Sequence, residues 1–390
     1  MFSKRIETLS ESLTIAISSL ARELKAAGKD VLGFSAGEPD FDTPELIKKA
    51  AIEAINEGFT KYTAVEGIPE LLDAISEKLK RDNNLDYKRN QIIVSNGAKH
   101  SLFNLFQTLI DEGDEVIIPA PYWVTYPELV KYSGGKPVFV DTDENSQFKI
   151  TAEQLKNAIT PKTKMLVLTT PSNPTGAVYS QEELEEIAEV LKGTDIYIAS
   201  DEMYEKLVYD AKFVSAASIN EDMYNRTITI NGLSKSVAMT GWRFGYLAAA
   251  DPELIKAMKK LQSQSTSNIN SITQKAAIVG LDGSVDGDIE YMREEFKKRR
   301  DEAVQLFNDI EGLSVLPPQG AFYLFVNTKE IEPDSMKFCK ELLEREGVAV
   351  VPGIGFGKDG YFRFSFATDI ESIRHGIERI KRFVETQKNS

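Results

Sequence analysis

A lysine and an arginine, Lys235 and Arg243, follow an alternating stretch of β-branched residues in the middle of the chain. The stretch 227–230 (TITI) predicts a buried strand, and Gly232 interrupts it shortly before Ser234. A lysine at the end of a buried strand can be partly desolvated, which lowers the pKa of its amine and makes it nucleophilic. Lys235 is therefore a candidate nucleophile, although a solvated loop lysine would give the same local pattern.

The composition restricts the kinds of partner that the protein can have. Its 390 residues exceed one ordinary core and predict two domains. The 60 acidic and 46 basic residues give a formal net charge of −14, which argues against a nucleic acid or an anionic membrane as a partner. A small anionic ligand would therefore have to be bound by a few local cations.

Cysteine and histidine are too rare to predict a disulfide or a metal site. The single cysteine, Cys339, lies in an amphipathic helical pattern where a buried thiol is expected. His100 and His375 lack the spacing of metal ligands. The chain has no apolar stretch of membrane length and no apolar signal-peptide core at its start, so a cytoplasmic protein is expected.

Two helices are predicted near the N-terminus. An amphipathic segment from Thr14 to about Gly28 is expected to pack on the body of the protein or on a second subunit. Thr43 followed by Pro44 predicts the start of the next helix, with Thr43 as its cap, and Gly58 predicts its end.

Strands and helices alternate from Gln91 to about Ala250. Because parallel strands need crossover connections, this alternation predicts an α/β fold with a mostly parallel sheet covered by helices on both faces. The mixed strands and helices toward the C-terminus predict a smaller α+β domain. We expect an N-terminal segment at 1–40 that joins the small domain, a large domain at 41–285 and a small C-terminal domain at 286–390.

Chemically useful side chains follow several predicted strands. Asn173 opens the turn NPTG, whose proline and glycine would aim its amide, and Asp201 with Tyr204 offers a carboxylate and a phenol. Since ligands bind at the C-terminal ends of parallel strands, these residues and Lys235 are expected to converge at one rim of the sheet. A bare turn at Asn173 and a helix cap at Asp201 are the alternatives.

A possible anion site precedes one predicted helix. Gly97, Ala98 and Lys99 lie between a strand and a helix, where free backbone amides and the helix dipole favour a phosphate group. An ordinary strand-to-helix turn would look the same in the sequence.

Taken together, an amine, a carboxylate, a phenol with an amide, and a phosphate site with Arg243 are the groups that a pyridoxal phosphate Schiff base needs. At this point the chain resembles the fold-type I aminotransferases of class I and II, and most closely their bacterial aspartate aminotransferase branch. The resemblance runs from SAGEPDFDTP through KYTAVEGIPEL, PYWVTYPE, PSNPTGAVY, SDEMYE and SKSVAMTGWRFGY to YFRFSFAT. It implies a mostly parallel sheet of the seven-stranded type in the large domain, which would bind the cofactor.

The resemblance implies catalytic roles for three residues. Lys235 would form the Schiff base with pyridoxal 5′-phosphate and later move a proton between the substrate and the cofactor. Asp201 would pair with the pyridinium nitrogen. Tyr204 and Asn173 would hydrogen-bond the ring oxygen, and Trp123 would stack on the ring unless it is a core tryptophan.

Further residues match phosphate and substrate positions of that family. The phosphate positions are Gly97, Ala98, Lys99, Ser234 and Arg243. Tyr62 would reach the phosphate of the neighbouring subunit, which implies a homodimer with shared sites, although a surface tyrosine is the simpler alternative. Arg363 would bind the substrate α-carboxylate, beside the Gly37 amide and the side chains of Trp123 and Asn173.

Two departures from the family pattern affect these expectations. Many relatives carry a serine where this chain has Gly232, and the segment 262–270 contains no arginine to bind a distal carboxylate. Lys99 is expected to bind that carboxylate, helped by Thr14 and, across the dimer, by Ser267. A lysine associated with prephenate in some members is replaced here by Ser10 or Glu11, so prephenate is not the expected substrate.

The resemblance implies transfer of the amino group between L-aspartate or glutamate and 2-oxoglutarate or oxaloacetate. Alternatives are an aminotransferase for aromatic amino acids, alanine or another amino acid, or a pyridoxal phosphate β-lyase of the same fold. A non-catalytic regulator on this fold would usually add a DNA-binding domain and a basic surface, and the sequence shows neither.

Overall fold

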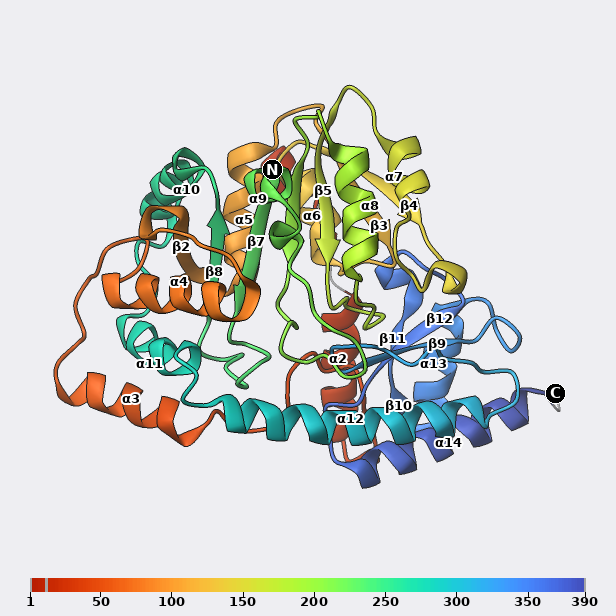
Figure 1. The fold of residues 1–390 in the computed structure, drawn as a ribbon. Helices are drawn as coiled ribbons and strands as arrows, with labels where there is room; N and C mark the ends of the chain where they lie inside the picture. The colour runs from red at the N-terminus through yellow and green to blue at the C-terminus, as the bar shows by residue number, and fades with distance from the viewer. Residues whose placement is uncertain (1, 11–12, 389–390) are drawn as a thin grey trace.

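The computed structural model of the protein describes residues 2–10 and 13–388 and has a seven-stranded sheet at its centre (Figure 1). The strands are β2 (Ile92–Asn96), β3 (Glu115–Ala120), β4 (Lys136–Asp141), β5 (Thr163–Thr169), β6 (Tyr197–Asp201), β7 (Thr227–Gly232) and β8 (Phe244–Ala249). Their order across the sheet is β2-β8-β7-β6-β5-β3-β4. The predicted α/β fold with a mostly parallel sheet is confirmed, because only β8 runs antiparallel to its neighbours.

The antiparallel direction of β8 follows from the connection that precedes it. Residues 233–243 join β7 to β8 and form turns without a helix. A parallel pairing would need a crossover of about a dozen residues or more, usually with a helix. The short connection instead turns the chain back beside β7. Lys235 and Arg243 therefore lie next to the end of β7 and the start of β8.

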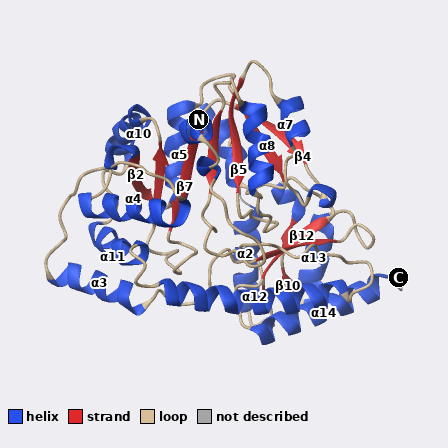
Figure 2. Cartoon of the chain, in the orientation of Figure 1, coloured by secondary structure: helices blue, strands red, loops and turns tan. Residues whose placement is uncertain are grey.

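Helices cover both faces of the large sheet, as Figure 2 shows. Met165 and Val167 of β5 pack in one apolar cluster and Leu166 and Leu168 in another, because successive side chains of a strand point to opposite faces. The first face carries α5 (Ala98–Leu109), α6 (Thr125–Tyr132) and α10 (Pro252–Ser265). The second carries α3 (Glu45–Asn56), α4 (Pro69–Asn83), α7 (Ala152–Ala158), α8 (Gln181–Leu191), α9 (Glu221–Arg226) and α11 (Ser271–Leu281).

A second, smaller assembly of strands and helices follows in the C-terminal part. Its antiparallel sheet has the order β11 (Val351–Pro352), β12 (Tyr361–Ser365) and β9 (Tyr323–Asn327). The helices α12 (Asp286–Asn308), α13 (Ser335–Glu346) and α14 (Ile370–Lys388) pack against it through an aromatic-rich core. Figure 1 shows α12 as a long helix along the lower edge of the molecule, beneath both sheets.

The N-terminal segment is attached to this smaller part. Strand β1 (Leu32–Gly33) pairs in parallel with β10 (Val348–Ala349). Helix α2 (Leu13–Ala26) packs beside them through Ala21, with Ile17 and Leu24 partly buried in the same apolar cluster. The short helix α1 (Lys4–Glu7) precedes it. Residues from the two ends of the chain therefore form one wall of the molecule.

Two local predictions can be compared with the structure. Cys339 is a free, buried cysteine in α13, as expected. The prediction that Thr43 caps α3 was wrong, because its hydroxyl donates instead to the backbone oxygen of Ala238 at 2.8 Å. Helix α3 begins at Glu45 without a side-chain cap.

Every helix among the described residues is too short or too polar to cross a lipid bilayer.

Candidate active site

The ends of the large sheet border a cavity of about 740 Å³ that also touches β12 and α2. It brings together most of the residues singled out in the sequence. The predicted residues that line it are Gly37, Ala98, Lys99, Trp123, Asn173, Asp201, Tyr204, Ser234, Lys235, Arg243 and Arg363. Residues from three predicted strand ends thus meet in one place, although their roles stay predictions.

Lys235 projects into this cavity from the connection between β7 and β8. Its Nζ donates a hydrogen bond to the backbone oxygen of Gly37. Burial lowers the pKa of Lys235 to about 8, and Arg363 and Arg243 act in the same direction while Glu38 opposes them. An amine with such a pKa is partly neutral near pH 8, which is the form that acts as a nucleophile or a base.

Asp201 ends β6 as a buried carboxylate. Its Oδ2 accepts a hydrogen bond of 2.7 Å from the hydroxyl of Tyr126, and its Oδ1 accepts one of 3.3 Å from the Met203 amide. Burial raises the pKa of Asp201, and these hydrogen bonds and the Lys235 charge counteract it. A buried carboxylate that faces a cavity suits a cationic ligand group.

The phenol of Tyr204 lies beside a second phenol. The hydroxyls of Tyr204 and Tyr323 are 2.8 Å apart, and either can donate. Burial raises the pKa of both phenols, so both keep their protons at neutral pH. Lys235 Nζ lies 5.9 Å from the centre of the Tyr204 ring.

Arg363, in β12, is the most buried cation of the cavity, with 2% of its surface exposed. Its guanidinium donates to Asn173 Oδ1 at 2.9 Å and to the Ser35 backbone oxygen at 2.8 Å, and its Nε has no partner. Among the described residues it forms no ion pair with a carboxylate. A buried guanidinium that keeps unused donors fits a planar carboxylate ligand.

The start of α5 offers an anion site. Gly97 precedes this helix with φ of 81°, and a Cβ there would lie only 2.3 Å from a guanidinium nitrogen of Arg243. Arg243 has the unusual φ of 55° and donates to the Thr240 backbone oxygen at 2.7 Å. Unusual backbone angles of this kind occur often at ligand sites. The free amides at the helix start and the adjacent guanidinium together suit a phosphate.

The structure gives a physical reason for Gly232. A Cβ at this position would lie 2.8 Å from the Phe244 backbone oxygen and 3.0 Å from Cε of Met203. The end of β7 therefore leaves no room for a serine side chain at this position. Ser234, two residues later, lines the cavity instead.

Lys99 and Trp123 form a pair within the cavity. Nζ of Lys99 lies 4.9 Å from the centre of a Trp123 ring, within the range of a cation–π contact. Burial lowers the pKa of Lys99, and the charge of Arg243 acts in the same direction. Trp123 also meets Tyr126 edge to face, with ring centres 5.4 Å apart.

Some predicted residues lie elsewhere. Tyr62 is 90% exposed and does not line the cavity of its own chain, and neither does Ser267. Thr14 falls within α2, but its side chain lies outside what the structure describes, as does Glu11. The backbone amide of Ser10 donates to the Glu128 carboxylate at 2.7 Å.

Sequence analysis missed several residues of the cavity. Tyr126 lies in the first turn of α6, and Trp123 lies just before that helix, so their closeness in sequence could have indicated that both face the cavity. Glu38 accepts a hydrogen bond of 2.9 Å from Thr240, and no local pattern connects these distant positions. Tyr323, and Arg22 and Lys25 of α2, also line the cavity.

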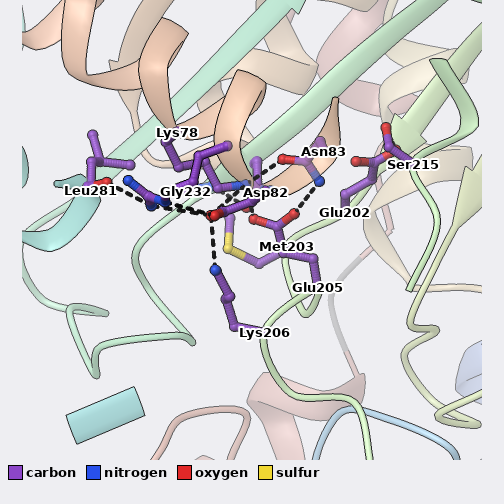
Figure 3. A network of polar contacts seen from close by, with 12 residues as sticks. Lys78, Asp82, Asn83, Glu202, Met203, Glu205, Lys206, Ser215, Gly232 and Leu281 are labelled. Atoms are coloured by element: carbon purple, nitrogen blue, oxygen red, sulfur yellow. Dashed lines mark hydrogen bonds and ion pairs between the residues drawn. The ribbon is translucent and has the colours of Figure 1, made fainter. Parts of the chain in front are cut away.

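A network of polar contacts joins α4 to the segment that follows β6 (Figure 3). Lys78 of α4 forms an ion pair with Glu205 and donates to Asn83 at 2.8 Å. The amide of Asn83 donates to Glu205 at 2.7 Å, and Lys206 pairs with Asp82 at 2.8 Å. These five residues, called the α4 network here, fix α4 against the segment that carries Tyr204.

Glu202, the neighbour of Asp201, lies close to the α4 network. One of its carboxylate oxygens accepts hydrogen bonds from Ser200 at 2.9 Å and from Ser215 at 2.8 Å. Burial, with Glu205 acting in the same direction, raises the pKa of Glu202 to about 7.

Sequence comparisons link the chain to known enzymes. The sequence profile described as "Aminotransferase class I and II" matches residues 29–380. The aspartate aminotransferase of Bacillus subtilis (strain 168) is 53% identical over 388 residues, which cover 98% of each chain. A probable aspartate/prephenate aminotransferase of Rhizobium leguminosarum bv. phaseoli is 50% identical over 385 residues, with 95% of this chain and 96% of that protein covered.

Solved structures of aspartate aminotransferases are similar to this chain over nearly its whole length. The aspartate aminotransferase of Rhizobium meliloti superposes with a TM-score of 0.96 at 44% identity and covers 99% of both chains. That of Thermus thermophilus with maleate superposes with a TM-score of 0.95 at 43% identity, over 98% of this chain and 99% of that one.

Proposed function

The chain belongs to the class I and II aminotransferases, and from this premise we propose that it moves the amino group between L-aspartate or L-glutamate and a 2-oxo dicarboxylic acid with pyridoxal 5′-phosphate. The full-length relatives named aspartate aminotransferase support this substrate class. The maleate in the Thermus thermophilus structure supports a dicarboxylic ligand.

The groups in the cavity fit this cofactor. Asp201 is a buried carboxylate available to a pyridinium nitrogen, and Lys235 is an amine whose pKa is lowered by burial. The amides at the start of α5, with Arg243 packed against Gly97, would hold the phosphate. Trp123 and Asn173, which line the same cavity, would contact the ring.

When bound, the cofactor supplies a carbonyl carbon that condenses with amines and a ring that accepts electrons from the substrate Cα. Lys235 would hold the cofactor through Nζ at that carbon, and the same Nζ, when free, would take up and return the Cα proton. Asp201 would hold the ring nitrogen in its protonated form. Arg363 would orient the substrate through its α-carboxylate.

One observation carries the proposal: Arg363 is buried in the same cavity as Lys235, with an unpartnered Nε and no acidic partner among the described residues. The test is a half-reaction of the holoenzyme with a panel of amino acids. An aminotransferase converts the bound cofactor to its amine form and releases one equivalent of 2-oxo acid. Release of pyruvate and ammonia would show a β-lyase. If no amino acid reacted, the proposed activity would be contradicted. Prephenate belongs in the panel of amino acceptors.

We also propose a homodimer in which Tyr62 completes the phosphate site of the partner subunit. The 90% exposure of Tyr62 supports this, as do Ile52 and Ile55 of α3, which leave 56% and 53% of their surfaces exposed. The test mixes inactive Lys235→Ala subunits with Tyr62→Ala subunits, which keep Lys235 and Arg243 in their own cavities but lack Tyr62 at both sites of their own dimer. Activity should reappear after subunit exchange, because a mixed dimer contains one intact site. No recovery despite demonstrated exchange would contradict shared sites.

The division into a segment at 1–40, a domain at 41–285 and a domain at 286–390 remains part of the proposal. It is supported by the pairing of β1 with β10 and by the start of α12 at Asp286. A cytoplasmic location is also proposed and is supported by the single free cysteine.

A further inference from the structure

The cavity is strongly cationic in a protein whose net charge is −14. Two of its charged side chains are carboxylates, Glu38 and Asp201. The cations among the described lining residues are Arg22, Lys25, Lys99, Lys235, Arg243 and Arg363. The proposed function uses Lys235, Arg243 and Arg363, and the sequence leads us to expect Lys99 deeper in the cavity as a ligand of the distal carboxylate. The two cations on α2 have no role so far.

Helix geometry directs these two cations toward the cavity. Arg22 and Lys25 are three positions apart, so they lie on the same side of α2. The apolar side chains of Ile17, Ala21 and Leu24 form a neighbouring stripe on α2. This stripe packs against the C-terminal part of the chain and holds the helix in place. Glu23, the acidic neighbour of Arg22, does not line the cavity.

Both cations lie at the edge of the cavity rather than in its depth. Arg22 and Lys25 are exposed to solvent, whereas Arg363 is 2% exposed. Lys25 forms no ion pair with any residue that the structure describes. Arg22 and Lys25 therefore lie closer to solvent than Arg363 does.

We propose that Arg22 and Lys25 form a cationic rim that recognises the second carboxylate of dicarboxylic ligands and raises their concentration at the cavity. The inference rests on the proposed function for the identity of the substrate. The rim opposes the repulsion that a protein of charge −14 exerts on a dianion. It acts more strongly on a dianion than on a monoanion, because the interaction energy scales with the ligand charge.

The test compares succinate with propionate as ligands of the holoenzyme, by calorimetric titration at low ionic strength. The variant is Arg22→Gln/Lys25→Gln, which keeps good helix formers in α2. Its dissociation constant for succinate should rise roughly tenfold, and that for propionate by about threefold or less. Added salt of about 0.5 M should remove most of the difference, since it screens exposed charges.

Lys29→Gln is the matched control, because it removes an exposed cation just beyond α2 that does not line the cavity. It should leave both dissociation constants within about twofold of the wild type. Equal losses for succinate and propionate, or the same loss in Lys29→Gln, would overturn the rim.

The proposed function fails separately from the rim. If the wild-type enzyme binds succinate through the rim but does not transaminate aspartate, the proposed substrate is wrong and the rim stands. If the enzyme transaminates aspartate and the double variant binds succinate like the wild type, the rim is wrong and the function stands.

Discussion

Two groups of buried charges share the segment 201–206, and they differ in how those charges are paired. In the α4 network, Lys78 and Glu205 pair with each other and with Asn83, so the charges are satisfied within the protein. In the cavity, Asp201 and Arg363 form no ion pair with a described residue, and Lys235 donates to a backbone oxygen. Charges that remain unpaired at such a desolvation cost indicate a place for ligand charges, whereas paired ones indicate a structural role.

The largest expected effect is on the cavity side. Lys235→Ala should lower transamination by roughly 10⁴-fold or more, because the nucleophile and the base are lost together. The visible absorption band of the lysine-bound cofactor should disappear. The thermal midpoint of the cofactor-free protein should not fall, since burial disfavours this charge. Multiple turnovers by the variant would disprove the role of Lys235.

Breaking the α4 network should reduce stability, whereas Lys235→Ala reduces activity. Glu205→Ala leaves the Lys78 ammonium buried without its partner, so the free energy of unfolding should drop by about 3–5 kcal/mol. Denaturant unfolding measures this loss. The double variant Lys78→Met/Glu205→Leu should recover much of it, and Glu189→Ala, in an exposed ion pair, should cost less than about 1 kcal/mol. A Glu205→Ala protein of wild-type stability would refute the comparison.

Asp201 and Glu202 allow the comparison at two adjacent residues. Asp201→Ala should weaken cofactor binding or slow the reaction by about 2–5 kcal/mol, as for other buried charge pairs that lose one partner. Glu202→Gln should change turnover by less than about threefold, because its carboxylate bonds to Ser200 and Ser215 rather than facing the cavity. Cofactor titration and steady-state kinetics measure both. Similar losses in both variants would mean that Asp201 has no special role.

The smallest effect concerns pH. Cofactor uptake by the cofactor-free protein needs the neutral amine of Lys235, whose pKa is lowered to about 8. The uptake rate should therefore rise roughly tenfold between pH 7 and pH 9 and then level off. Stopped-flow absorbance measures this profile. A rate that keeps rising tenfold per pH unit above pH 9 would indicate a lysine with an ordinary pKa.

The sequence predicted the parts of the fold that local patterns determine. The alternation of apolar strands and amphipathic helices predicted the sheet and its helical layers. Turns after the strands located Asn173, Asp201 and Lys235, because parallel strands end on the same side. The direction of β8 was not specified, since it depends on the helix-free connection at 233–243.

The rest of the site depends on contacts between distant parts of the chain. Tyr323 meets Tyr204 across 119 residues, and Glu38 meets Thr240 across 202 residues. Neither pair leaves a local pattern in the sequence, because each joins parts of the chain that meet only in the folded protein. Thr43 shows the converse, since a good local cap signal gave way to a contact with Ala238.

The union of the two chain ends has a consequence for biosynthesis. Arg363 donates to the backbone oxygen of Ser35, which lies 328 residues earlier. Likewise, β1 can pair only after β10 has been synthesised. At ~5–20 residues per second, a ribosome needs roughly 15–65 s to make that stretch. During this time the apolar side chains of α2 lack their contacts with Leu343 and Ala349. The contact between Arg363 and Ser35 can form only when translation is nearly complete, so a chain terminated before Arg363 lacks it.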